Sequence, residues 1–143
     1  MSLQHDNYKE VILAYTKSDW QPLLDLIPKI EETRKFYEVG GGEEVEKNVF
    51  EFPYYISAPV INEFLKVVYQ IPIIVDFAWM DWSEGKLMVR DKNFDYDTVD
   101  IPTKCQLITA YVRSDRFSDG TLALSFERGV MLRILKSIQK QLS

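Results

Sequence analysis

The segment 101–143 carries the feature that most constrains the fold, because its apolar residues recur at helical spacing. Ile101, Cys105, Ile108 and Val112 are four, three and four positions apart, which places them on one face of a helix. The end of the chain repeats the pattern with a second set of apolar residues, namely Met131, Ile134, Leu135, Ile138 and Leu142. Because an amphipathic helix must bury its apolar face against another element, this segment predicts packed helices.

The same spacing predicts further helices along the chain. They are expected over residues 8–14, 19–36, 58–69 and 122–128. Pro28 should break or kink the second of these, because proline cannot donate the helical hydrogen bond. We therefore expect a mainly α fold, a compact single-domain bundle of five to seven helices.

One or two short β segments are also compatible with the sequence. The candidates are residues 48–56, 73–75 and 87–89, whose aromatic or β-branched composition suits a strand. Residues 73–79 remain open, because their start favours a strand whereas Trp79 and Trp82 lie one helical turn apart.

The remaining segments predict loops inside one globular domain that covers residues 1–143. Residues 39–47 hold three consecutive glycines between glutamates, and those acids would repel a phosphate. Residues 84–100 are polar and rich in aspartate. They do not match a calcium loop, because Tyr96 and Pro102 stand where such a loop needs glycine and glutamate. We therefore expect an acidic, solvated loop there.

Composition narrows the classes of function. The 143 residues are 46% hydrophobic and 13% aromatic, which suffices for one core without disulfides. Cys105 is the only cysteine and His5 the only histidine, so an internal disulfide, a thiolate metal cluster and a histidine-rich zinc site are excluded. No apolar run approaches the roughly 18 residues of a membrane span, and the first residues lack a signal-peptide pattern. We expect a cytoplasmic protein with no cofactor, no metal and no membrane contact.

Charge divides unevenly along the chain. Residues 1–100 carry 10 basic and 19 acidic side chains, whereas residues 101–143 carry 7 basic and 3 acidic ones. The basic C-terminal part could form an anion-binding surface. It could equally pair with the acidic part of the same domain, which is the commoner arrangement.

Two groups of residues are candidate sites. Arg113, Asp115, Arg116 and Arg128 could bind an anion or a partner, since guanidinium groups match phosphate and carboxylate oxygens. The structural alternative, which we favour, is an ion-paired helix end in which Asp115 neutralises the arginines.

The second group is an aromatic patch made of Trp79, Trp82, Tyr54 and Tyr55. Aromatic rings stack on bases, but nucleic-acid binding also needs nearby positive charge. The neighbours of the tryptophans are acids, namely Asp76, Asp81 and Glu84. Core packing or a protein-binding patch is therefore the better interpretation.

Residues 107–123 carry the most distinctive motif, Leu-Ile-Thr-Ala-Tyr-Val-Arg-Ser-Asp-Arg-Phe-Ser-Asp-Gly-Thr-Leu-Ala. This run resembles the signature Leu-Thr-Ala-x-Val-Arg-x-Asp-Arg-Phe-x-x-Gly-x-Leu of a bacterial family of domains of unknown function, family 6508. Weaker likeness extends the resemblance over residues 50–140. The resemblance implies a mainly helical fold and no known activity. Where the family often has histidine, this chain has Tyr111 and Thr121.

These observations order three functions. The first is a small non-enzymatic domain that binds an unknown protein partner or forms a homo-oligomer. The second is nucleic-acid or anion binding through the basic C-terminal helices, which a steep salt dependence would reveal. The third is an enzyme that uses carboxylates such as Asp76 and Asp81, although no spacing in the sequence distinguishes an acid from a base.

Overall fold

The two predicted C-terminal stripes form the central helices α6 (Ile101–Ser114) and α8 (Val130–Gln141). Their apolar faces meet in the core, where Ile108 and Ile134 are fully buried. The Asp100 carboxylate caps α6 by accepting a hydrogen bond of 2.9 Å from the Thr103 amide. Local periodicity and a cap therefore account for this part of the fold, as predicted.

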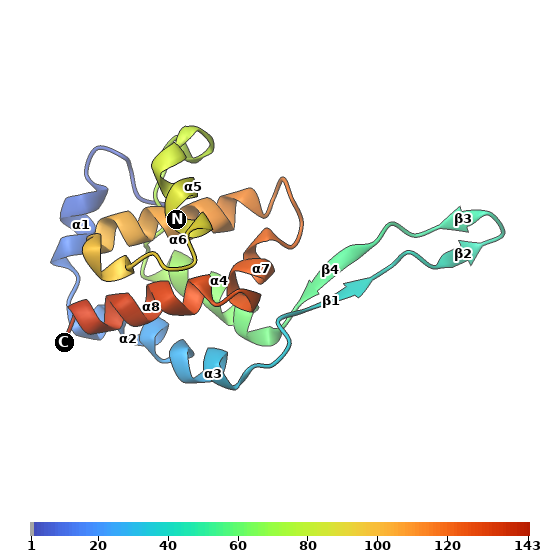
Figure 1. Cartoon of the computed structure of the whole chain (residues 1–143), viewed down its shortest axis with the longest axis horizontal. Helices are drawn as coiled ribbons and strands as arrows, with labels where there is room; N and C mark the ends of the chain where they lie inside the picture. The colour runs from blue at the N-terminus through green and yellow to red at the C-terminus, as the bar shows by residue number, and fades with distance from the viewer. Residues whose placement is uncertain (1) are drawn as a thin grey trace.

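Figure 1 shows the computed structural model, which describes residues 2–143. The helices pack around one another, and a long β-hairpin projects from one end of the helical body (Figure 1). Over residues 2–143 there are eight α-helices, which in addition to α6 and α8 are α1 (Tyr8–Ala14), α2 (Lys17–Leu24), α3 (Leu26–Glu32), α4 (Pro59–Gln70), α5 (Ser83–Arg90) and α7 (Thr121–Glu127). The mainly helical class is thus confirmed.

The N-terminal helices follow the prediction with shifted boundaries. Thr16, rather than Asp19, is the N-cap of α2, and the two side chains form a reciprocal capping box. Pro28 cannot donate to the carbonyl of the residue four positions earlier, and α2 ends at that residue, Leu24. Asp25 keeps helical torsion angles between α2 and α3, so the described chain holds seven helical segments if these two are counted as one.

The loop predicted over residues 84–100 is wrong. Its first part forms α5, so the strand considered for residues 87–89 is also wrong, and Tyr96–Thr98 forms a 3-10 helix, η2. Gly85 lies directly against the Trp82 ring, where a Cβ would come within 2.3 Å of the ring carbon Cε3. Packing against Trp82 accounts for a helix whose own sequence is polar.

The ambiguous segment after α4 forms neither a long strand nor an α-helix. Ile73 and Ile74 are fully buried, and Val75 makes a single parallel bridge with Leu3. Trp79–Asp81 then forms a short 3-10 helix, η1. Burial rather than strand pairing explains the β-branched composition of this segment.

The loop predicted over residues 39–47 is wrong as well, because these residues pair with the extended segment that follows them. β1 (Tyr37–Gly40) pairs antiparallel with β4 (Tyr54–Ser57), and β2 (Glu44–Glu46) pairs with β3 (Val49–Phe50). The turn at the tip contains Asn48 in the left-handed region, at φ 64°. We call residues 37–57 the arm.

One further property concerns all helices of the described chain. Within residues 2–143, none combines the length and apolar character needed to cross a bilayer.

Candidate functional site

The structure separates the predicted arginine cluster. Arg113 forms an ion pair of 3.0 Å with Asp76, and Asp115 accepts a hydrogen bond of 3.0 Å from the Leu122 amide at the start of α7. Within residues 2–143, Asp115 forms no ion pair with either arginine, so the ion-paired helix end that we favoured is wrong in its pairing. Asp115 instead caps α7.

The predicted aromatic patch also divides into two parts. Trp79 and Trp82 belong to the helical body, where the Trp82 ring contacts Phe77 at 5.4 Å between centroids. Tyr54 and Tyr55 lie on β4, and as neighbours in a strand they point to opposite faces of the arm. The four rings do not form one surface.

The family-like motif holds the base of the arm. The Asp119 carboxylate accepts a hydrogen bond of 2.9 Å from the Tyr55 amide, which ties β4 to the turn between α6 and α7. Gly120 has φ +91° and lies under Tyr55, since a Cβ there would come within 2.7 Å of the ring. The Tyr37 ring packs on Tyr55 from the paired strand at 4.9 Å. These contacts position the arm relative to the helices.

Beyond its base, the arm exposes apolar side chains. Phe52 is 89% exposed, Phe50 63% and Val45 65%. Val39, Val49, Tyr54 and Ile56 are exposed as well. The arm also carries five glutamates and one lysine, so its surface combines apolar and acidic groups. In the pairing of β2 with β3, Glu44 lies directly opposite Phe50, which places an acid and a ring on the same face.

A small apolar pocket lies between α5, η1 and α6. Its volume is about 170 Å³, and its lining includes Trp79, Trp82, Val89, Leu107 and Tyr111. We call it the tryptophan pocket. Of the predicted aromatic residues, the two tryptophans therefore line a cavity instead of filling the core.

A larger groove of about 900 Å³ continues from this pocket, because Val89 and Tyr111 line both. Among the described residues, its lining contains four cations and no carboxylate. The cations are Arg90, Lys92, Arg128 and Arg133. We call it the basic groove. Of the predicted anion-binding residues, it contains only Arg128.

The groove is held in place by buried aromatic residues. Arg133 donates a hydrogen bond to the Phe94 carbonyl, and its guanidinium lies 5.0 Å from the centre of the Tyr96 ring. Burial raises the pKa of Tyr111 to about 12, the charge of Tyr96 adds to the rise, and Arg128 opposes it. Tyr111 therefore stays a neutral hydroxyl at ordinary pH.

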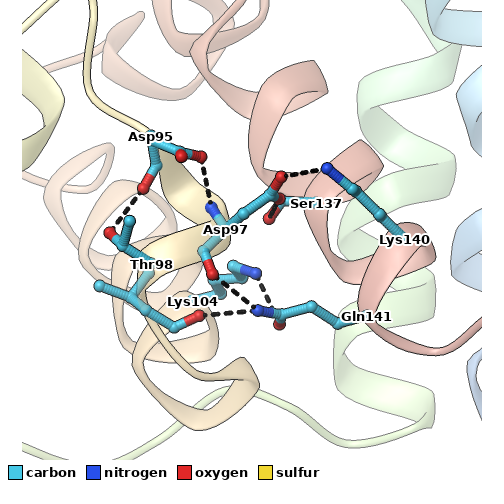
Figure 2. Close-up of polar contacts among 8 residues, drawn as sticks. Asp95, Asp97, Thr98, Lys104, Ser137, Lys140 and Gln141 are labelled. Carbon is cyan, nitrogen blue, oxygen red and sulfur yellow. Dashed lines mark hydrogen bonds and ion pairs between the residues drawn. The ribbon is translucent and has the colours of Figure 1, made fainter.

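Other basic side chains of α8 pair with acids of the same chain, as Figure 2 shows for Lys140. The Lys140 ammonium lies 2.8 Å from Asp97, and Ser137 donates to the same carboxylate. These hydrogen bonds, with that of Lys140 the larger, lower the pKa of Asp97 below its ordinary value of 3.8. Lys136 pairs with Glu31 at 3.2 Å. The charge asymmetry is thus partly internal to the domain.

A buried lysine completes this network. Lys104 is fully buried, and its ammonium donates a hydrogen bond of 2.6 Å to the Gln141 side chain (Figure 2). Gln141 in turn donates to the carbonyls of Asp97 and Val99. The burial of Lys104 lowers its pKa, because a charged ammonium is disfavoured away from water. The network joins α6, η2 and α8 and stabilises the ends of these elements.

The sequence did not reveal the two features that now stand out. Arg90 and Lys92 were assigned to a loop, and the apolar residues of the arm were assigned partly to a loop and partly to an edge strand. The alternation of glutamate with valine at residues 43–46 was the only local signal of an extended arm. Nothing local brings Arg90 near Arg128.

Fold and surface together define a helical domain that carries a projecting β arm beside an apolar pocket and a basic groove. The chain belongs to a family of unknown function, DUF6508, whose sequence model matches residues 15–143. The resemblance found in the sequence is thus confirmed. Comparison with curated proteins finds no match, and neither does comparison with solved structures.

Proposed function

We propose that this protein is a non-enzymatic cytoplasmic domain that binds another polypeptide through its arm. The observation that carries the proposal is the exposure of large apolar side chains on a hairpin that projects away from the helices (Figure 1). Apolar groups gathered on one exposed element are typical of a protein interface.

The architecture of the arm supports this proposal. Within the described chain, each of its two ladders contains only two strands, and an isolated two-stranded hairpin is marginally stable in water. Its outer edges leave backbone groups unpaired, which another chain can use for strand addition. A bound polypeptide would cover the apolar side chains and pair these edges at once.

The charge of the arm favours a polypeptide over other partners. Five glutamates against one lysine would be repelled by the phosphates of a nucleic acid and by an anionic membrane surface. A protein surface with basic and apolar groups has no such conflict.

The non-enzymatic part of the proposal rests on how the reactive groups are used. Cys105 is buried, and burial raises the pKa of its thiol, which opposes formation of the nucleophilic thiolate. Asp97 and Asp100 of the acidic run serve as an ion-pair partner and a helix cap.

Site-specific photo-crosslinking in the native cells tests this function. A photoreactive residue replaces Phe52 in one variant and Leu13, an exposed residue of α1, in a matched control; the two are 89% and 67% exposed. We expect a protein adduct from position 52 and none from position 13. The purified pair should then bind, with at least tenfold loss of affinity on Phe52→Ser. Equal adducts at both positions, nucleic-acid adducts or no adduct at position 52 would contradict the proposal.

A further inference from the structure

We infer that the partner of the arm is a second copy of this chain, whose tryptophan pocket and basic groove receive the arm. This inference rests on the proposed function of the arm and names its partner. The structure supplies three arguments, from charge, from shape and from reach.

Charge complementarity is the first argument. The arm carries five glutamates and one lysine, and the groove is lined by four cations without a carboxylate. Arg90, Lys92 and Arg128 form no ion pair within residues 2–143, in contrast to Lys136 and Lys140 of α8. The groove is thus the basic surface that the acids of this same domain leave unneutralised. Opposite charge on the two surfaces favours their encounter and fixes their orientation.

The second argument is the match between apolar groups. An apolar cavity of about 150 Å³ can hold a benzene molecule, so a pocket of about 170 Å³ has room for one phenyl ring. Phe50 and Phe52 are exposed rings on the arm, and Glu51 lies between them in the sequence. One arm therefore presents a ring to the tryptophan pocket and an acid to the adjoining groove. Aromatic anchors that fill pockets dominate the binding energy of most interfaces.

Reach is the third argument, because it decides between one chain and two. The arm extends along the long axis of the molecule, and its tip at β2 and β3 points away from α5 and α6 (Figure 1). The tip cannot fold back onto the groove of its own chain while Asp119 and Gly120 hold its base. Two copies related by a twofold axis can each place an arm in the other's groove, and the two contacts then reinforce each other.

Reciprocal charge reversal tests the inference. One variant carries Glu46→Lys and Glu51→Lys in the arm; neither carboxylate makes a hydrogen bond within residues 2–143. The other carries Arg90→Glu and Arg128→Glu in the groove. By sedimentation velocity, the wild type should dimerise, and each variant alone should dissociate at least tenfold more readily. An equimolar mixture should recover the dimer, because each reversed surface then meets an opposite charge.

Three controls accompany this experiment. Glu10→Lys with Lys66→Glu reverses two exposed charges on α1 and α4 and should leave the dimer unchanged. Phe52→Ser should weaken the dimer at least tenfold, whereas Leu13→Ser should not. Raising the salt from about 0.05 M to about 0.5 M should also weaken it, since exposed charges are then screened. Circular dichroism and melting curves establish that every variant folds.

The outcomes separate this inference from the proposed function. A monomeric wild type, or a dimer indifferent to groove reversal, overturns the second copy, and an adduct at position 52 with a different protein would still support the function of the arm. If the groove variant loses binding to a labelled oligonucleotide while arm reversal changes nothing, the groove serves a nucleic acid and the inference is wrong. Recovery of the dimer only in the mixed sample supports it.

Discussion

The helical body and the arm treat the same residue types in opposite ways. Phe64 on α4 is fully buried, whereas Phe52 on the arm is 89% exposed. Of the eleven large hydrophobic side chains that are exposed within residues 2–143, seven lie on the arm. The body satisfies its apolar surface and much of its charge internally, and the arm does neither. This difference indicates that the body is built for stability and the arm for contact.

The largest expected effect contrasts the two phenylalanines. Phe64→Ala should lower the free energy of unfolding by about 3–5 kcal/mol, because it leaves a cavity in the core. Phe52→Ala should change it by less than about 0.5 kcal/mol in the monomer, because no packing is lost there. Urea unfolding at low protein concentration measures both. A large loss for Phe52→Ala would show that the arm packs on its own body, against our comparison.

The junction between body and arm gives the next largest effect, read from two glycines. Gly129→Ala should cost about 1 kcal/mol, since it has φ +77° and open space around it. Gly120→Ala should cost about 2–3 kcal/mol, because backbone strain is joined by a clash with Tyr55. Limited proteolysis should also cut the arm of the Gly120 variant faster. Equal costs for the two variants would mean that Tyr55 does not depend on Gly120.

A smaller effect is expected within the body, at the helix cap. Asp115→Ala should cost about 1 kcal/mol, the usual contribution of an N-terminal cap, and not the several kcal/mol of a buried ion pair. Arg116→Gln should be nearly neutral, since Arg116 is exposed and has no ion-pair partner in the described chain. Thermal melts of the two variants compare the roles. A loss for Arg116→Gln as large as for Asp115→Ala would restore the ion-paired cluster.

The smallest effect concerns pH. The folded pKa of Asp97 lies below its ordinary value of 3.8, so its charge stabilises the fold at higher pH. That stabilisation is lost as the pH falls through 3.8 towards the folded pKa, where the unfolded chain binds the proton first. Asp97→Asn should therefore melt lower than the wild type at pH 7, and the gap should close in acid. A constant gap across this range would assign the loss to packing.

Several parts of the fold could be predicted because their signals are local. Helix α1 was expected at residues 8–14 and found there, and α6 and α8 follow their apolar stripes. The end of α7 before Gly129 was expected from the left-handed preference of glycine. The resemblance to a family of unknown function came from one short motif. Of the candidate site residues, Trp79, Trp82 and Arg128 line cavities, and the others serve the structure or the arm.

What only the tertiary structure decided involves partners far apart in the chain. Helix α5 depends on packing against Trp82, and the arm depends on pairing between β1 and β4 across a loop of its own sequence. Lys136 pairs with Glu31, 105 residues away. The basic groove joins Arg90 to Arg128 from separate elements. A helix closes its hydrogen bonds within one segment, so its spacing is visible in the sequence, whereas pairing, burial and charge neutralisation depend on which distant segments the fold brings together.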